Sequence, residues 1–596
     1  MARLSKEEIH SYVGDVLPLY LIGDGIDKDS DVSFTVTGEA ARIRTFTSDC
    51  EFSIKNGALV SLVREGVATV TAVYNGVEYL TRVTASPMKE TEMSEDMLYL
   101  VGDMHHHTSM NHNHHEFGMH IKEDISDYVD FMRNEGLLDF TVISDHADVT
   151  NDLDFWRGFT LAEGEAPIIF AGAESEVTHK ETDRLGILHR HSGELVTMMS
   201  AGYANVESFR EFLEEMSYSA KPFAIFAHPH VVGFSTRGIW NFDFMKNNNS
   251  DMLSVMRGME MGNGEDRKEN LLHEYAYPAA LDAGFKISTT CGSDAHGPHT
   301  GYNGMSGKTV LLAKGKTKED IHEAFLKNRF YASESGNLKI WYTVNGIPAP
   351  ATLPLETKYT FKVKLGYFRD DANSIPVRCE VKSDYGKTVK EIKIAGDELE
   401  FTVESETARY FYLKFIDGNA RKTWSYPVWC GREFDTYCEP KIKALDHEGF
   451  TAVSDGDDVS KVINGDPYDF WLSKKANPSV VIDMKEERKI AALGYYPLIV
   501  VRGKDKGPDW VTSDDTRSLV SAFKVYTSLD GESWELVADR VAETLGCENI
   551  VEFAERLARY VRFDAISNIG VDSGIPRYKE SLTAIANLTV FEKDAE

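Results

Sequence analysis

The hydrophobic pattern divides the chain into stretches of two kinds. In residues 31–86, 337–437 and 445–594, apolar and polar positions alternate in short runs interrupted by Gly and Asn, which is typical of antiparallel β-strands. In residues 98–335, short apolar runs alternate with amphipathic segments, which favours α/β structure with a parallel sheet. Residues 1–27 are expected to form an acidic, partly helical lead-in.

Three amphipathic segments of the α/β stretch predict helices: 123–135, 206–217 and 317–329. The first places four apolar residues on one face at helical spacing: Ile125, Tyr128, Val129 and Met132. Thr317 and Asp320 have the spacing of a capping box, which satisfies backbone N–H groups at a helix start. The helix faces explain these residues fully, so we assign them no chemistry.

A chain of 596 residues is too long for a single hydrophobic core. The changes in pattern predict four domains: a β domain with its lead-in at 1–90, an α/β domain at 98–335, a β-sandwich at 336–438 and a further β domain at 441–596. A polar, charged linker at 88–97 separates the first two.

Histidine is concentrated in residues 98–116, LYLVGDMHHHTSMNHNHHE. An extended backbone puts residues i and i+2 on one face, so His105 and His107 can reach one metal ion while His106 points away. Neutral imidazole is the commonest protein ligand for metals near neutral pH. A solvated histidine-rich loop is the alternative interpretation of this stretch taken alone.

Four later apolar runs also end in residues that bind metals. DFTVIS precedes Asp145 and His146, PIIFAGA precedes Glu174, FAIFA precedes His228 and His230, and FKISTTCGS precedes Asp294 and His296. In a β/α barrel the carboxyl ends of the strands form one rim, which would bring these residues together. A single such ending means little, but five in one domain predict a metal site.

Composition limits the partners of the protein. The net charge of −31 argues against a broad nucleic-acid or anionic-membrane surface, and 42% hydrophobic residues suit a globular protein. No run is long and apolar enough for a membrane span, and the N-terminus lacks a clear signal peptide. The six cysteines lack zinc-site spacing. These features predict a cytoplasmic protein, or a secreted one if a signal peptide has been removed.

The motifs GDMHHHT, ISDHAD, AGAE, AHPH and GSDAH resemble, in order, those of the PHP (polymerase and histidinol phosphatase) family of metal-dependent phosphoesterases. The segments MEMGNG and WSYPVWCG resemble most the branch that includes carbaryl-type hydrolases. The resemblance covers about residues 98–435. It implies a distorted, TIM-like (β/α)7 barrel flanked by β-sandwich domains, a multidomain fold of the α/β plus all-β class.

The resemblance also implies two or three divalent cations and their ligands. The first metal would be held by His105, His107, Glu174 and Asp294, and Glu174 would bridge to a second metal held also by His228. Three further positions match ligands of a third metal: His112, His146 and His296, with His114 and His115 as alternatives to His112. The family usually offers another histidine where TDRLGILHRH places Arg184. His179, His189 or His191 is the alternative ligand, unless the second metal has fewer ligands. This mixture of nitrogen and oxygen donors suits Zn, Mn or Fe.

A hydroxide that bridges two such cations is the expected nucleophile. Asp294 is the candidate proton acceptor and His230 the candidate proton donor to the leaving group. Arg237 and Arg184 are candidates for binding a substrate oxyanion. The structural alternative for His230 is that it only supports the metal ligands from outside. The alternative for Arg237 is a local ion pair.

The terminal domains resemble two binding modules. The segment from IKNGALVSLV to EYLTRVTAS resembles bacterial Ig-like repeats. Residues 445–594 resemble the factor 5/8 type C (discoidin-like) fold, which is also used as a carbohydrate-binding module. That resemblance implies core positions for Trp471 and Trp534 and a structural calcium ion near Asp466; Trp510 is a candidate stacking residue whose alternative is a loop anchor.

The sequence therefore predicts a divalent-metal-dependent phosphoesterase that acts on a small-molecule or glycan-linked substrate, with no nucleic-acid or membrane partner. One alternative keeps the metals but cleaves carboxylic ester, carbamate or amide bonds. Another is a non-catalytic carbohydrate-binding protein. The sequence does not determine the oligomeric state.

Overall fold

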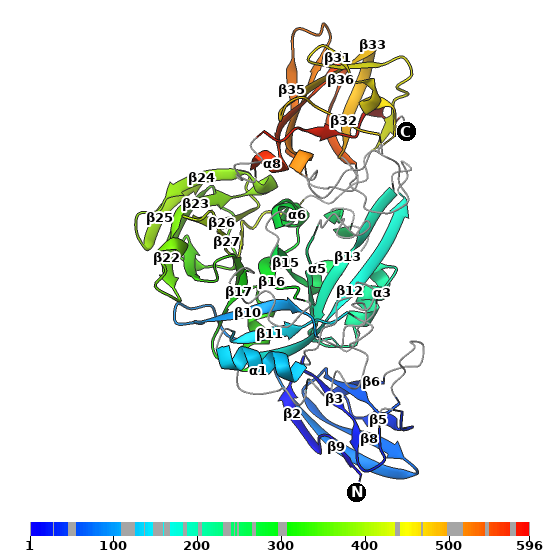
Figure 1. Ribbon diagram of the computed structural model, residues 1–596, viewed down its shortest axis with the longest axis vertical. Helices are drawn as coiled ribbons and strands as arrows, with labels where there is room; N and C mark the ends of the chain where they lie inside the picture. Colours follow the sequence, from blue (N-terminus) through cyan, green and yellow to red (C-terminus); the bar gives the residue numbers. More distant parts are fainter. Residues whose placement is uncertain are drawn as a thin grey trace.

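The structure is a computed structural model. It describes residues 2–27, 29–45, 55–108, 125–135, 138–146, 159, 167–182, 188–200, 205–229, 240–242, 245–246, 250–264, 270–295, 307–434, 441–466, 469–497, 517–542, 548–572 and 580–594. In Figure 1 the N-terminal strands lie at one end of the long axis and the C-terminal strands at the other.

The central region contributes nine strands to one sheet. They are β10 (Leu98–His106), β11 (Phe140–Ile143), β12 (Ile168–Thr182), β13 (Leu188–Met198), β14 (Phe223–Phe226), β15 (Met256–Asn263), β16 (Ser288–Gly292), β17 (Lys308–Ala313) and β18 (Phe330–Ser333). The sheet has 15 strands in all, because it continues from β18 through β27 into the following region.

The predicted (β/α)7 barrel is wrong. Strands make up 53% of the structure and helices only 13%. β12 and β13 form a long antiparallel hairpin, and β13 is also antiparallel to β14. β17 runs antiparallel to β10, and β18 pairs with β27, which extends the sheet into the following region. Among the described residues, β10 and β16 form no ladder. They are joined at their carboxyl ends by an isolated bridge between His106 and Ala295 and by the hydrogen bond from the N–H of Asp294 to the carbonyl of His105.

Six α-helices lie in the described residues: α1 (Ile125–Glu135), α3 (Phe209–Met216), α5 (Met252–Val255), α6 (Asn270–Asp282), α7 (Lys318–Leu326) and α8 (Ile569–Asp572). The three predicted helices are confirmed as α1, α3 and α7, with the four predicted apolar residues of α1 all buried. Thr317 and Asp320 form the predicted capping box of α7. Helix periodicity was therefore a sound guide, although it did not determine how the strands pair.

The N-terminal region is made of strands throughout. They are β1 (Arg3–Leu4), β2 (Glu8–Tyr12), β3 (Val16–Leu19), β4 (Leu21–Ile22), β5 (Ser33–Thr37), β6 (Ala41–Thr45), β7 (Ala58–Leu62), β8 (Gly66–Tyr74) and β9 (Val77–Ser86). The partly helical lead-in is wrong, because the described part of residues 1–27 holds β1 to β4 and no helix. Two sheets, β2-β9-β8-β5 and β3-β7-β6, enclose one core. The Ig-like resemblance stays a prediction.

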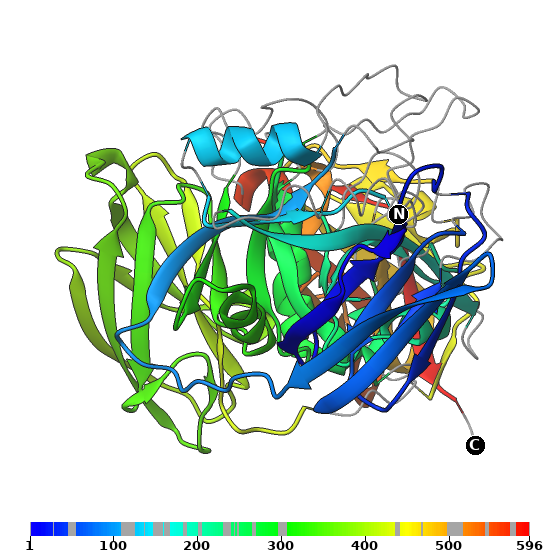
Figure 2. The same ribbon diagram turned by 90° about the horizontal axis from the view of Figure 1, so that it is seen from below.

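Residues 338–429 form a β-sandwich beside the central region, as Figure 2 shows from below. Its strands are β19 (Leu338–Val344), β20 (Ile347–Pro348), β21 (Ala351–Thr352), β22 (Lys358–Tyr367), β23 (Pro376–Lys382), β24 (Thr388–Lys393), β25 (Glu398–Glu404), β26 (Tyr410–Asp417), β27 (Lys422–Trp424) and β28 (Val428–Trp429). The four-stranded sheet β20-β19-β22-β25 packs on the extension of the large sheet around an aromatic core.

The C-terminal region is a second all-β unit with its own core. Its strands are β29 (Ile442–Ala444), β30 (Thr451–Ser454), β31 (Asp457–Asp458), β32 (Trp471–Leu472), β33 (Ser479–Tyr496), β34 (Val520–Ser528), β35 (Glu535–Val541), β36 (Asn549–Asn568), β37 (Ala584–Ile585) and β38 (Asn587–Lys593). Across the described residues, none of the helices has the length and apolarity to cross a membrane.

Candidate metal centre

Six predicted ligand residues from separate parts of the sequence lie side by side. They are His105 and His107 on and just after β10, His146 after β11, Glu174 on β12, His228 after β14 and Asp294 after β16. Five of these follow or end a strand, as predicted. Glu174 does not, because β12 continues to Thr182 and carries this carboxylate in its middle.

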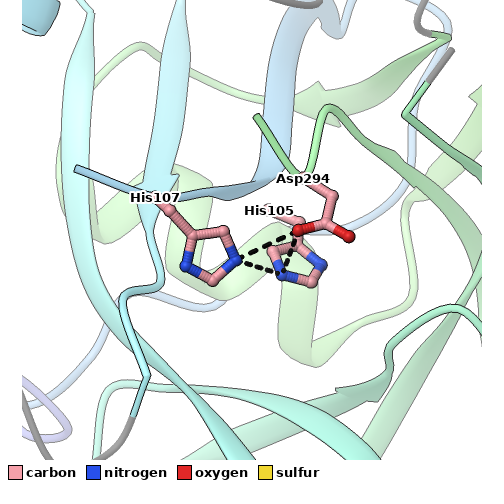
Figure 3. A group of neighbouring side chains, drawn as sticks. All are labelled: His105, His107 and Asp294. Carbon is pink, nitrogen blue, oxygen red and sulfur yellow. Dashed lines mark hydrogen bonds and ion pairs between the residues drawn. The ribbon is translucent and has the colours of Figure 1, made fainter. Parts of the chain in front are cut away.

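His105, His107 and Asp294 form the first part of this cluster (Figure 3). The two Nε2 atoms of the histidines are 3.0 Å apart. Oδ1 of Asp294 lies 3.1 Å from Nε2 of His107 and 3.5 Å from Nε2 of His105. Three donor atoms thus face one common point, as the H-x-H spacing predicted.

Glu174 lies at the centre of the cluster and uses both of its oxygens. Oε1 is 2.8 Å from Nε2 of His228 and 3.3 Å from Nε2 of His105. Oε2 is 3.3 Å from Nε2 of His107 and 3.5 Å from Nδ1 of His146. A carboxylate that faces different imidazoles with each oxygen has the geometry needed to bridge two cations.

Glu260 on β15 fixes the orientation of two of these histidines. Its Oε1 lies 3.0 Å from Nδ1 of His105, and its Oε2 accepts a hydrogen bond from the backbone N–H of His228 at 2.7 Å. When Nδ1–H of His105 donates to Glu260, the lone pair of Nε2 is left facing His107 and Asp294. This is the arrangement that metal-ligating histidines usually have. The sequence prediction assigned no role to Glu260.

Glu194 on β13 is a second carboxylate that sequence reasoning missed. It is buried, and its Oε2 lies 3.5 Å from Nε2 of His228. β12 and β13 pair Glu176 with Glu194, so Glu194 shares a face with Glu174 two residues along the neighbouring strand. Glu194 thus offers an oxygen next to His228, where the family resemblance left a ligand missing.

The backbone at the cluster is held in a strained form. His228 has φ of +24° and Asp294 has φ of +46°, values that are uncommon for residues with a side chain. The N–H of Asp294 donates to the carbonyl of His105 at 2.8 Å. Asp103 accepts hydrogen bonds from the N–H groups of His105 and Ser293, which joins β10 to β16. Strain of this kind is found preferentially at functional sites.

The electrostatics of the cluster favour positive charge. Burial alone lowers the pKa of the imidazoles, but Asp294 and Glu174 outweigh it and raise the pKa of His107 to about 9. The same balance, dominated by Glu174, raises the pKa of His228 to about 10. Although burial opposes it, His105 and its neighbours hold the pKa of Glu174 well below its usual range. The carboxylates therefore create a negative potential that a cation can neutralise.

The donor set fits divalent metal ions. The ligand atoms form three overlapping groups, each within 4.8 Å: His105–His107–Asp294, His105–Glu174–His228 and His107–His146–Glu174. Nitrogen and carboxylate oxygen in this proportion are the donors that Zn, Mn and Fe prefer. The orientation of His105 by Glu260 is an independent feature that points to the same use.

The remaining candidates have different outcomes. His106 turns away from the cluster, as predicted, and stacks on Tyr128 with ring centroids 3.6 Å apart. His179 stacks on Phe209 at 4.7 Å. Seven candidates lie outside the described residues: His112, His114, His115, Arg184, His230, Arg237 and His296. The side chains of His189 and His191 are likewise not described.

In the C-terminal region, residues 447–577 match the family model of the F5/8 type C domain, which confirms the resemblance of this segment. Neither tryptophan is fully buried, contrary to the predicted core positions: Trp471 is half-buried against the edge of the core, and Trp534 is half-buried with Arg562 4.7 Å from its ring centroid. Asp466 is exposed, and Trp510 lies outside the described residues. A comparison with curated protein sequences gave no match to the chain.

Solved structures that are similar to part of the chain include two carbohydrate-binding modules. CpGH89CBM32-5 from Clostridium perfringens, in complex with GalNAc-β-1,3-galactose, is 15% identical, covers 25% of this chain and 99% of its own, and gives a TM-score of 0.20. The family 32 CBM of Clostridium perfringens NanJ, in complex with galactose, is 18% identical with the same coverages and the same TM-score of 0.20.

Proposed function

We propose that the central region is a divalent-metal-dependent hydrolase that cleaves phosphoester bonds. One observation carries this proposal: Glu174 lies between His105, His107 and His228 with both oxygens engaged. Acidic and imidazole side chains meet there in a largely buried cluster; they come from β10, β11, β12, β14 and β16 or from the residues just after these strands. A purely structural role does not require so many ionisable groups in one buried place, because burying them is costly.

The side chains divide into two overlapping ligand sets. His105, His107 and Asp294 would hold one cation, and His228 with Glu194 would hold a second, with Glu174 shared between them. Bound cations supply Lewis acidity and make water a nucleophile at neutral pH. Asp294 is the most exposed of the carboxylates, with 21% of its side chain accessible, so it is the group placed to accept a proton from a water molecule.

The choice of a phosphoester rests on the resemblance of the five motifs to the PHP family. The F5/8 type C match in residues 447–577 supports a glycan-linked substrate, because modules of this fold are used to bind carbohydrates. Carboxylic ester and carbamate hydrolysis remain as outcomes of the test, since the same ligand set can polarise a carbonyl.

The test combines metal analysis with turnover. Purified protein is expected to contain a transition metal, to lose turnover of p-nitrophenyl phosphate or bis-p-nitrophenyl phosphate after chelation, and to regain it when the metal is restored. Glu174→Gln and Asp294→Asn should abolish turnover, whereas Glu398→Gln on the exposed edge strand β25 should not. Activity on naphthyl esters alone would replace the phosphoester assignment, and full activity in both site variants would exclude the centre.

A further inference from the structure

A cavity of about 500 Å³ lies where three parts of the chain meet. The residues that line it come from α6 of the central region, from β23, β24 and β26 of the β-sandwich and from the C-terminal region around α8. Figure 1 shows where these elements lie in the chain. Tyr275 of α6 donates a hydrogen bond to Asp572 of α8 at 3.0 Å, which joins two of these elements. The cavity has a size suited to a small ligand.

The sandwich wall of this cavity is rich in cations. Glu380 of β23 pairs in register with Lys414 of β26, and Lys382 pairs with Tyr412, so these side chains share one face of the sheet. Arg378 lies two residues before Glu380 and faces the same way. The face that the sheet turns toward α6 therefore alternates basic, acidic and aromatic groups.

Carboxylates do not balance the cations of this wall. Glu380 is shared by Arg378 at 3.0 Å and Lys382 at 3.2 Å. Glu274 of α6 is shared in the same way by Lys414 and Lys422. Asp572, the third carboxylate of the lining, accepts hydrogen bonds from the hydroxyls of Tyr275, Ser521 and Ser567. The four cations therefore exceed the three carboxylates by one positive charge.

The two pairs of cations differ in what they join. Lys414 and Lys422 fasten α6 to the sandwich through Glu274, which is a sufficient reason for their presence. Arg378 and Lys382 do not join the sandwich to α6: both pair with Glu380 of their own strand, and Lys382 also donates a hydrogen bond to the hydroxyl of Thr388 on β24 at 2.8 Å. Among the described atoms, Nε of Arg378 is buried and has no hydrogen-bond partner. A local positive excess is also unusual in a chain of net charge −31.

We propose that this cavity, here called the junction cavity, binds a small organic anion that carries hydroxyl groups. The cations of the sandwich wall would take its charged group. Tyr385, Thr388, Tyr412 and Ser521 also line the space, and residues of this polar and aromatic kind suit a polyhydroxylated body. A sugar that carries a phosphate or a carboxylate has this chemistry. The inference does not depend on the proposed hydrolase, since none of the candidate metal ligands lines the junction cavity.

The test is calorimetric titration of the full chain with inorganic phosphate, glucose 6-phosphate, galacturonate and, as the neutral control, galactose. Glu174→Gln protein treated with chelator is used, so that binding at the metal centre does not contribute. Glucose 6-phosphate or galacturonate is expected to bind more tightly than galactose, and the stronger of the two identifies the charged group.

Arg378→Gln/Lys382→Gln should weaken anion binding about tenfold or more, because hydrogen bonds to charged groups are lost. Lys390→Gln is the matched control: this exposed lysine is in register with Val381, so it lies on the opposite face of the same sheet. Absence of anion binding in the parent protein, undiminished binding in the double variant, or equal weakening by Lys390→Gln would each overturn the proposal.

Discussion

His105 and Glu260, which are 155 positions apart, share a 3.0 Å contact between Nδ1 and Oε1 in the buried centre of the molecule. The same carboxylate accepts hydrogen bonds from the backbone of His228 at 2.7 Å and from Nδ2 of Asn263 at 2.9 Å. One side chain on β15 therefore sets the direction of two candidate ligands that come from β10 and β14. Glu260 acts on the centre by positioning these ligands.

Glu260→Gln should weaken metal binding, because the amide no longer enforces the Nδ1–H tautomer of His105. Loss of such a partner typically costs about ten- to hundredfold in affinity. Titration of the metal-free protein with Zn²⁺ measures this change, and far-UV circular dichroism checks that the fold is kept. Glu214→Gln, on the exposed side of α3, is the control. An affinity equal to that of the parent protein would show that Glu260 does not orient the ligands.

Glu194 gives a second, separable prediction. If its Oε2 completes the set around His228, Glu194→Gln should leave one tightly bound metal ion and remove another. Plasma mass spectrometry of the dialysed variant measures the ratio of metal to protein, with Glu398→Gln in parallel. An unchanged ratio of metal to protein would show that Glu194 lies near the centre but is not a metal ligand.

Sequence reasoning found the candidate ligands because their signals were local. The H-x-H spacing and the polar residues directly after apolar runs identified His105, His107, His228 and Asp294. Glu194 and Glu260 carry no such signal, since Glu194 precedes an apolar run and Glu260 lies between Met259 and Met261. Their proximity to the cluster depends on how β13 and β15 pair with their neighbours, and that register is a long-range property.

The barrel prediction failed for a related reason. Periodicity shows where a strand lies but not the direction of its neighbour. A parallel sheet was predicted for residues 98–335, but the stretch between Glu174 and His228 contains the return strand β13, which pairs antiparallel on both sides. The parallel pairing within β10-β11-β12 and within β14-β15-β16 agrees with the predicted parallel sheet. The antiparallel hairpin that joins these two segments was not predicted.

Gly292 supplies a third prediction. A Cβ atom at this position would lie 2.3 Å from Cβ of His105 and 2.4 Å from Oε1 of Glu260, so both must move. Gly292→Ala should destabilise the protein by about 1–3 kcal/mol, as overpacking in a core usually does. It should also weaken Zn²⁺ binding, because it displaces a ligand and its orienting carboxylate together. Thermal unfolding and metal titration measure the two effects.

The control for this substitution is Gly396→Ala, where an added Cβ atom meets nothing within 4 Å. This variant should match the parent protein in both measurements. If Gly292→Ala also matched the parent, the close packing of β10, β15 and β16 around His105 would be contradicted.

His322 of α7 links the N-terminal strands to the central region. Its Nε2–H donates to the carbonyl of Lys221 at 2.9 Å, and its Nδ1 lies 3.3 Å from the hydroxyl of Tyr12. Burial lowers the pKa of His322 to about 4; among nearby charges, Asp15 opposes this change while Lys318 and Lys221 add to it. The imidazole is therefore neutral in the folded protein at pH values where an unfolded histidine is already protonated.

Stability should consequently fall as the pH drops from about 6.5 to about 4, because only the unfolded state binds the proton in this window. The full effect of His322 corresponds to about 3 kcal/mol and is absent above pH 7. Thermal unfolding midpoints across this range measure it. His322→Gln should flatten part of the acid decline, whereas His10→Gln, at an exposed site on β2, should not. An identical decline in all three proteins would place the pH-sensitive group elsewhere in the molecule.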